Sequence, residues 1–288
     1  MKKLSEVLHA KGSHWVGDGF PVRSLFSYGD DAQAISPFLL FDYAGPHFFG
    51  PSITPRGVGK HPHRGFETIT IVYDGEVSHR DSTGGGGTIG PGDVQWMTAA
   101  GGIIHEEFHS PSFTRSGGPF RMVQLWVDLP AKDKMARPGY QSISSADIPV
   151  VELPNGAGRV RVIAGQFGDA TGPARTFSPV NLWDVRLAQD AEVQLDLAEG
   201  HTAMIAALSG QVTINGGDRV GEAEIARFER DGSTVAVRVE SEAMLLVMTG
   251  EPLDQPVFGY GPFVMTSETE IRQAIDDFNN GRFGQVAA

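Results

Sequence analysis

Short apolar runs separated by turn residues dominate this sequence. Its 37 glycines and 18 prolines are scattered between these runs instead of being gathered in one tract. Such spacing is typical of antiparallel strands joined by tight turns. The sequence therefore predicts an all-β fold with few helices. The candidate strands are Phe38–Tyr43, Thr68–Tyr73, Asp93–Thr98, Arg121–Leu129, Val160–Ala164, Leu182–Leu187, Ala203–Leu208, Val235–Val239 and Met244–Met248.

The domain organisation follows from length and from one change in composition. A chain of 288 residues suits one large or two smaller domains. The segment Pro130–Pro149 is rich in charged residues, Ser and Pro and lacks a strong period. We therefore predict a first domain at residues 1–135 and a second at 136–288.

The two halves carry a weak internal repeat. ETITIVYDGEV at 67–77 and TAMIAALSGQV at 202–212 share an apolar strand, a glycine and a valine, 135 residues apart. By this offset Asp196 and Ala198 match His61 and His63, so the second copy lacks that pair. Eight of the nine histidines lie at or before His109. Any site chemistry is therefore expected in the first half.

The clearest helix is predicted near the C-terminal end. Ser267 and Glu270 form an S-x-x-E capping box. Four apolar residues follow at helical spacing: Ile271, Ala274, Ile275 and Phe278. Asn280 and Gly281 are expected to end this helix, whose role we take to be structural.

Composition excludes several classes of function. The net charge is −12, with 35 acidic against 23 basic side chains, which argues against nucleic acid or an anionic membrane as a partner. The absence of cysteine excludes disulfides, thiolate metal sites and cysteine catalysis. We see neither a signal peptide nor a run of about 20 apolar residues that could span a bilayer. A cytoplasmic protein with a small or neutral ligand is expected.

Two pairs of potential metal ligands share one spacing. His61 and His63 precede an apolar run, and His105 and Glu107 follow a Gly-Gly turn. Side chains at i and i+2 of a strand point to one face. If the alternation continued unbroken, Ile69 and Ile71 would share the face of the first pair.

An isolated H-x-H often arises by chance, but two such pairs in a glycine-rich β context predict one metal site. Three imidazoles and a carboxylate suit Fe(II), Ni, Cu, Mn or Zn.

Other polar residues near these pairs are weaker candidates. Glu67 is expected to accept a hydrogen bond from a ligand sooner than to be a ligand itself. His79 and Asp81 are expected at the surface or in a hairpin. His109 could form a helical pair with His105, but its neighbours favour a strand. Gly84–Gly87 is expected to be a flexible hairpin, since no Lys-Ser/Thr and no helix follow it.

Several of these motifs occur together in one known family. HPHRGFET, the Asp81–Ser82 pair, PGDVQWMTAAGGIIHEE and PFVMTSETEIRQAIDDFNNGRFG resemble the pirin family of the cupin superfamily over nearly the whole chain. This resemblance implies a bicupin, with two stacked antiparallel β-barrels of jelly-roll type and a metal in the N-terminal one only. On the matching positions it implies His61, His63, His105 and Glu107 as ligands and Fe(II) as the metal.

The resemblance also implies an activity. Bacterial pirins are similar to quercetin 2,3-dioxygenases, which cleave a flavonol with O₂ and release CO. Glu107 would then be both a ligand and the base that takes the substrate's 3-hydroxyl proton. The alternative is an iron-binding, redox-sensing regulator that acts through protein partners without turnover, as animal pirins suggest. A metal-dependent isomerase or hydrolase is the third option.

Overall fold

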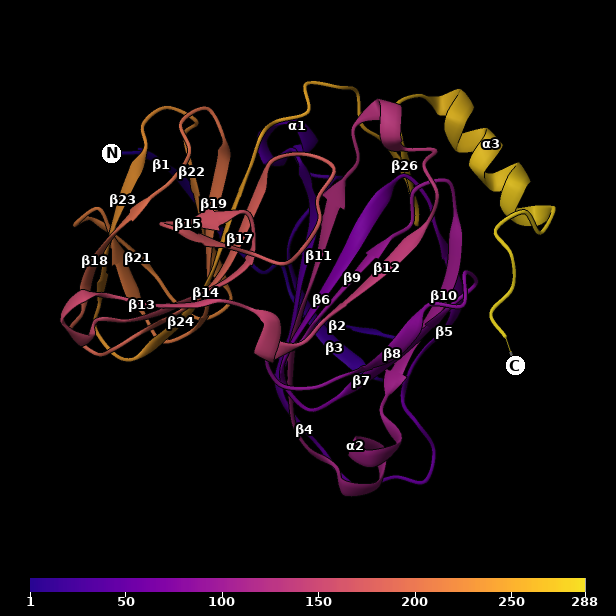
Figure 1. The fold of residues 1–288 in the computed structure, drawn as a ribbon, viewed down its shortest axis with the longest axis horizontal. Coiled ribbons are helices and arrows are strands. Elements are labelled where there is room, and N and C mark those ends of the chain that lie inside the picture. Colours follow the sequence, from indigo (N-terminus) through magenta and orange to yellow (C-terminus); the bar gives the residue numbers. More distant parts are fainter. Residues whose placement is uncertain (288) are drawn as a thin grey trace. The chain divides into compact units, whose positions relative to one another are not determined.

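Antiparallel strands dominate the computed structural model, which describes residues 1–287 (Figure 1). The chain forms two compact units, each built from separate stretches of sequence. The N-terminal unit contains Gly12–Gln33, Phe38–Ser145 and residues from Leu253 onward. The C-terminal unit contains Met1–Lys11, Ala34–Pro37 and Ala146–Pro252.

The N-terminal unit is a jelly roll in which a seven-stranded sheet faces a four-stranded sheet. The larger sheet has the order β12-β9-β6-β11-β4-β3-β2, and the smaller has the order β5-β10-β7-β8. A hairpin of β25 and β26 follows later in the chain. The strands are β2 His14–Val16, β3 Phe20–Ser27, β4 Phe38–Phe49, β5 Gly57–His63, β6 Phe66–Asp74, β7 Val77–Asp81, β8 Gly86–Ile89, β9 Val94–Thr98, β10 Ile103–His109, β11 Gly118–Asp128, β12 Gly139–Ile143, β25 Phe258–Tyr260 and β26 Phe263–Met265.

The C-terminal unit repeats this plan. Its sheets have the orders β1-β22-β19-β24-β17-β14-β13 and β18-β23-β20-β21, with a separate β15-β16 hairpin. The strands are β1 Leu4–His9, β13 Val150–Glu152, β14 Gly158–Ala164, β15 Gln166–Phe167, β16 Ala170–Thr171, β17 Val180–Leu187, β18 Glu192–Asp196, β19 Thr202–Ser209, β20 Val212–Ile214, β21 Asp218–Val220, β22 Glu224–Phe228, β23 Thr234–Val239 and β24 Ala243–Gly250. The all-β jelly-roll prediction is confirmed, although each unit consists of two sheets and not of one closed barrel.

Helices are short and few. They are α1 Ala32–Ile35, α2 Pro111–Ser116 and α3 Glu268–Asn279, with 3-10 turns at Ala131–Asp133, Ser145–Asp147 and Pro154–Gly156. The predicted helix is α3: the Ser267 hydroxyl accepts from the Glu270 amide, and the Glu270 carboxylate accepts from the Thr266 amide. Within residues 1–287, no helix combines the length and apolar character needed to cross a membrane.

The ends of the chain belong to the opposite units from those expected. The division at residue 135 gave the first strand to the first domain and α3 to the second. Instead β1 pairs with β22 in the C-terminal unit, and α3 belongs to the N-terminal unit. The physical reason for the placement of α3 is that its Ile271 and Ala274 pack in one apolar cluster with residues of β26. A buried ion pair between Arg64 and Asp277, with a nitrogen–oxygen distance of 2.8 Å, fixes the helix further. No single cut in the sequence can describe such units.

The repeat also has a different register from the one expected. In the N-terminal unit His61 of β5 lies opposite His105 of β10. In the C-terminal unit Leu195 of β18 lies opposite Val235 of β23. The offset of 135 residues relates β6 to β19, but the segment before them differs by one residue. Leu195, and not Asp196, therefore takes the place of His61.

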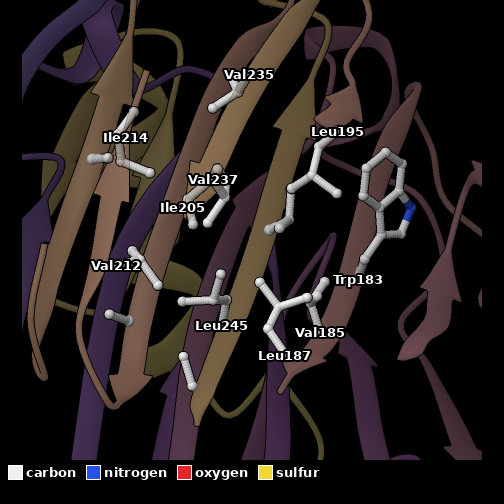
Figure 2. Close-up of a cluster of buried hydrophobic side chains, with 14 of the residues drawn as sticks. Trp183, Val185, Leu187, Leu195, Ile205, Val212, Ile214, Val235, Val237 and Leu245 are labelled. Carbon is white, nitrogen blue, oxygen red and sulfur yellow. The ribbon is translucent and has the colours of Figure 1, made fainter. Parts of the chain in front are cut away.

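Around Leu195 the interior of the C-terminal unit is lined by apolar side chains. Figure 2 shows Leu195, Ile214, Val235 and Val237 packed among the side chains of the opposite sheet. All four are at most 1% exposed. Burial of aliphatic side chains from both sheets stabilises this part of the jelly roll.

Candidate metal centre

Strand β10 carries the centre of the candidate site because it lies between β5 and β7. His105 lies opposite His61 on one side and opposite Asp81 on the other, and Glu107 lies opposite His79. Residues directly opposite one another in an antiparallel sheet share a face. Six polar side chains therefore project from one face of the small sheet: His61, His63, His79, Asp81, His105 and Glu107.

Three of the predicted ligands converge. The rings of His61 and His105 have their centroids 4.1 Å apart, and the His63 ring lies 4.9 and 4.8 Å from them. One nitrogen of each ring lies within 4.8 Å of the other two. His61 is partly exposed, whereas His63 and His105 are buried. The Nδ1–H of His61 donates to the Gly59 carbonyl at 2.8 Å, which leaves its Nε2 lone pair free.

Vacant ring nitrogens fit a metal ion. Among residues 1–287, His63 Nδ1 and His105 Nε2 are buried without a hydrogen-bond partner. Burial lowers the pKa of both histidines well below its usual value, and the neighbouring imidazoles add to the effect. Buried polar atoms are normally paired, and neutral imidazoles are good ligands for divalent metals. The donor set therefore fits the metal that the sequence predicts.

The Glu107 carboxylate is held by donors from the opposite sheet. Thr70 Oγ1 and Gln95 Nε2 donate to Oε1 at 3.3 and 3.0 Å, and Gln124 Nε2 donates to Oε2 at 3.1 Å. These three donors are aligned because Thr70 lies opposite Gln95 in β9 and opposite Gln124 in β11. Three hydrogen bonds keep the carboxylate in a fixed orientation.

The four predicted ligands lie in two overlapping groups. The first contains the three histidines, and the second contains His79, His105 and Glu107. His105 is shared by both groups. Glu107 thus lies beside the three-histidine cluster, with its carboxylate bonded to Thr70, Gln95 and Gln124.

The prediction that Ile69 and Ile71 of β6 share a face with His61 and His63 is wrong. Phe66 contacts the His63 ring, with centroids 5.1 Å apart, and Thr70 reaches Glu107. By alternation Ile69 and Ile71 point to the other face. The alternation is interrupted at Gly65, whose φ of +93° suits glycine and turns the chain between β5 and β6.

His79 and Asp81 lie in the β7-β8 hairpin, which was one of their two expected positions, but they are not at the surface. Both lie in β7 and are only 1% and 3% exposed. His79 Nε2 lies 3.2 Å from Asp81 Oδ2, and its ring stacks on Tyr140 with centroids 5.0 Å apart. Burial alone would raise the pKa of Asp81, but hydrogen bonds from His79 and Thr83 lower it overall. Burial, with the Glu107 and Asp81 charges, raises the pKa of Tyr140 to about 12. The H-x-D spacing could have revealed this pair, since it repeats that of the two ligand pairs.

The weaker candidates have structural explanations. Glu67 was expected to accept a hydrogen bond from a metal ligand, but it accepts one from Thr98 Oγ1 at 2.7 Å. Burial raises the pKa of Glu67 to about 7. His109 lies in a strand, as predicted, and its ring bonds the Gly19 carbonyl. Gly84–Gly87 forms the turn and start of the β7-β8 hairpin, also as predicted.

Equivalent interior positions of the two jelly rolls carry different kinds of side chain. Strand register relates five residues of the candidate site to aliphatic residues of the C-terminal unit. His61, His63, His79, His105 and Glu107 correspond to Leu195, Leu197, Ile214, Val235 and Val237. The three donors to Glu107 correspond to Ile205, Ala226 and Val247. All eight apolar residues belong to one core cluster. The fold therefore does not require polar groups at these positions.

Two antiparallel jelly rolls, one with imidazoles converging in its interior, define a two-domain protein of the cupin type. Comparison with known protein families supports this assignment. Residues 19–127 match the pirin family, and residues 182–284 match the pirin C-terminal cupin domain. The chain belongs to the pirin family.

Individual relatives cover nearly all of the chain. A protein of Pseudomonas aeruginosa named "putative quercetin 2,3-dioxygenase" is 57% identical, over 98% of this chain and 99% of its own length. Rat pirin is 36% identical over 89% of this chain and 85% of its own length. The crystal structure of a quercetin 2,3-dioxygenase from Acinetobacter baumannii covers the whole of both chains with 51% identity and a TM-score of 0.97.

Proposed function

We propose that the protein is a metal-dependent dioxygenase that cleaves a flavonol such as quercetin with O₂ and releases CO. The observation that carries this proposal is the cluster of buried imidazoles beside an oriented carboxylate, in an interior that the second jelly roll fills with aliphatic side chains. The names of the relatives at 57% and 51% identity support the choice of reaction.

The proposed metal ligands are His61, His63, His105 and Glu107. A divalent metal at this position would supply a positive charge and open positions for the substrate oxygen and for O₂. Fe(II) is the expected ion, and the nitrogen and oxygen donors also suit Ni, Cu, Mn and Zn. The His61 ring is oriented by the Gly59 carbonyl, and burial keeps the His63 and His105 rings neutral.

Glu107 is the proposed base. Its carboxylate is the acceptor that would receive the proton of the flavonol 3-hydroxyl, and Thr70, Gln95 and Gln124 hold it in place for that transfer. A deprotonated flavonol is electron-rich, which favours its reaction with O₂. Aromatic rings flank the site: Phe66 and Trp126 stack with centroids 4.3 Å apart beside His63.

Anaerobic reconstitution with Fe(II), followed by quercetin and O₂, tests the activity. We expect CO release in step with O₂ uptake. Glu107→Gln should abolish CO release while the variant still binds iron. Glu106→Gln is the matched control, because Glu106 is on the outer face of β10, where Arg80 donates to it at 2.9 Å. This control should keep its activity.

Failure of the test would favour a different class. Tight iron binding without CO release would contradict the flavonol reaction. It would favour the regulator that acts through protein partners, which predicts metal-dependent capture of a partner. Turnover of another substrate without O₂ would instead favour an isomerase or hydrolase.

A further inference from the structure

One ring nitrogen of His105 has an unusual partner. A histidine that binds a metal through one nitrogen normally donates its other N–H to a carbonyl or carboxylate, which fixes the ring's tautomer and orientation. His61 follows this pattern with the Gly59 carbonyl at 2.8 Å. His105 is fully buried, and its Nδ1 lies 3.3 Å from Nδ1 of a second histidine, His79. One of these two nitrogens must carry the proton and the other must accept it.

The surroundings of His79 decide which nitrogen accepts. Its Nε2 lies 3.2 Å from Asp81 Oδ2, and an ionised carboxylate can only accept, so Nε2 carries a proton. Its Nδ1 also lies 3.1 Å from the amide nitrogen of Gln95, which is a donor. A proton on His79 Nδ1 would point at this donor. Nδ1 of His79 is therefore unprotonated, and its lone pair is shared between the Gln95 N–H and His105 Nδ1–H.

The orientation of Gln95 is itself fixed by two partners. Its amide nitrogen donates to Glu107 Oε1 at 3.0 Å, and the Tyr140 hydroxyl donates to its amide oxygen at 3.4 Å. Reversal of this amide would place oxygen against the Glu107 carboxylate. The same NH₂ group donates toward both His79 and Glu107. Its positive end therefore disfavours a second cation bound by His79, His105 and Glu107.

Asp81 is anchored in turn. Its Oδ1 accepts from the Thr83 amide at 2.7 Å, from the Thr83 hydroxyl at 2.6 Å and from the Gly85 amide at 3.1 Å. The tight turn between β7 and β8 thus fixes the carboxylate. In strand register Asp81 lies directly opposite His105, and His79 lies opposite Glu107.

We infer that Asp81 and His79 form a relay that holds His105 as its Nδ1–H tautomer and presents Nε2 to the metal. Both are positioning residues and neither is a ligand. The inference rests on the metal site of the proposed function but not on the flavonol reaction. It also explains why His105 Nε2, and not Nδ1, is the buried nitrogen without a partner.

Metal affinity in two His79 variants tests the relay. His79→Phe keeps an aromatic ring against Tyr140 but removes the acceptor, whereas the amide oxygen of His79→Gln can still accept from His105. With zinc(II) as the probe and a competing chelator, the wild type should bind one equivalent. We expect His79→Phe to bind about 10–100-fold more weakly and His79→Gln to recover part of that loss. His109→Phe is the matched control in β10 and should stay within about twofold of the wild type.

The tautomers can be observed directly without any variant. Long-range proton–nitrogen NMR spectra of the zinc-loaded, ¹⁵N-histidine-labelled protein should show His105 protonated at Nδ1 and His79 protonated at Nε2. A different tautomer of either ring would overturn the relay. Unchanged zinc affinity in His79→Phe would also overturn the relay. So would a wild type that binds two equivalents of zinc when His79→Phe binds only one, because His79 would then be a ligand. A wild type that binds no metal would instead refute the metal site itself.

Discussion

Replacement of Lys134 by Met should destabilise the N-terminal unit by about 3–5 kcal/mol, which is the usual effect of breaking a buried ion pair from one side. Its side chain is 1% exposed, and the ammonium group donates to Asp128 at 2.5 Å and to the carbonyls of Gly65 and Val264, both at 2.9 Å. Methionine fills similar volume but removes this donor from two buried carbonyls and from Asp128 Oδ1, and it leaves the Asp128 charge without its cation.

The pKa shifts agree with this view of the pair. Burial lowers the pKa of Lys134 and raises that of Asp128, so desolvation outweighs their attraction. Removing the carboxylate charge as well should therefore recover part of the loss. We expect Lys134→Met with Asp128→Asn to be more stable than the sum of the single changes by about 1–3 kcal/mol.

Urea unfolding followed by tryptophan fluorescence is the assay, because Trp15, Trp96 and Trp126 lie in the N-terminal unit. Lys132→Met is the matched control, since Lys132 lies two residues away and is exposed. It should change the free energy of unfolding by less than about 0.5 kcal/mol. A loss below about 1 kcal/mol for Lys134→Met would show that the buried acceptors do not depend on this ammonium group.

Three further predictions concern residues at or near the site. The folded-state pKa of Glu67 is raised to about 7, above the usual 4.5, so its contribution to stability is full at low pH and is lost as pH rises toward 7. Glu67→Gln should therefore gain on the order of 3 kcal/mol relative to the wild type between pH 4.5 and 8, by urea unfolding; a pH-independent difference would contradict this. A Cβ on Gly65 would lie 1.9 Å from the Val264 carbonyl oxygen, so Gly65→Ala should cost about 2–5 kcal/mol, and Gly59→Ala, which meets open space, should not. His63→Leu should abolish metal binding measured by titration, because it removes one of the three converging imidazoles; unchanged metal binding would count against the metal site.

Local patterns in the sequence were sufficient for several features. The glycine and proline spacing predicted the all-β fold, and the capping box at Ser267 predicted α3. The spacing of His61 with His63 and of His105 with Glu107 predicted two pairs on one face. Such features follow from backbone period and neighbouring hydrogen bonds, which are local properties.

Only the tertiary structure showed which strands lie beside one another. His79 and Asp81 join the site because β7 pairs with β10, and the sequence gives no register for that pairing. Leu195 replaces His61 for the same reason. Strand pairing is decided by contacts between distant segments, and a shift of one residue moves every side chain to the other face.

Local sequence patterns thus specify the strands, the C-terminal helix and the candidate ligands. The structure decided which face of β6 meets the site, which unit α3 joins and how His105 is oriented. Each of these depends on groups far apart in the chain: the turn at Gly65 beside Val264, the Arg64–Asp277 ion pair, and the contact between His79 and His105. Their energies exist only after the sheets have formed.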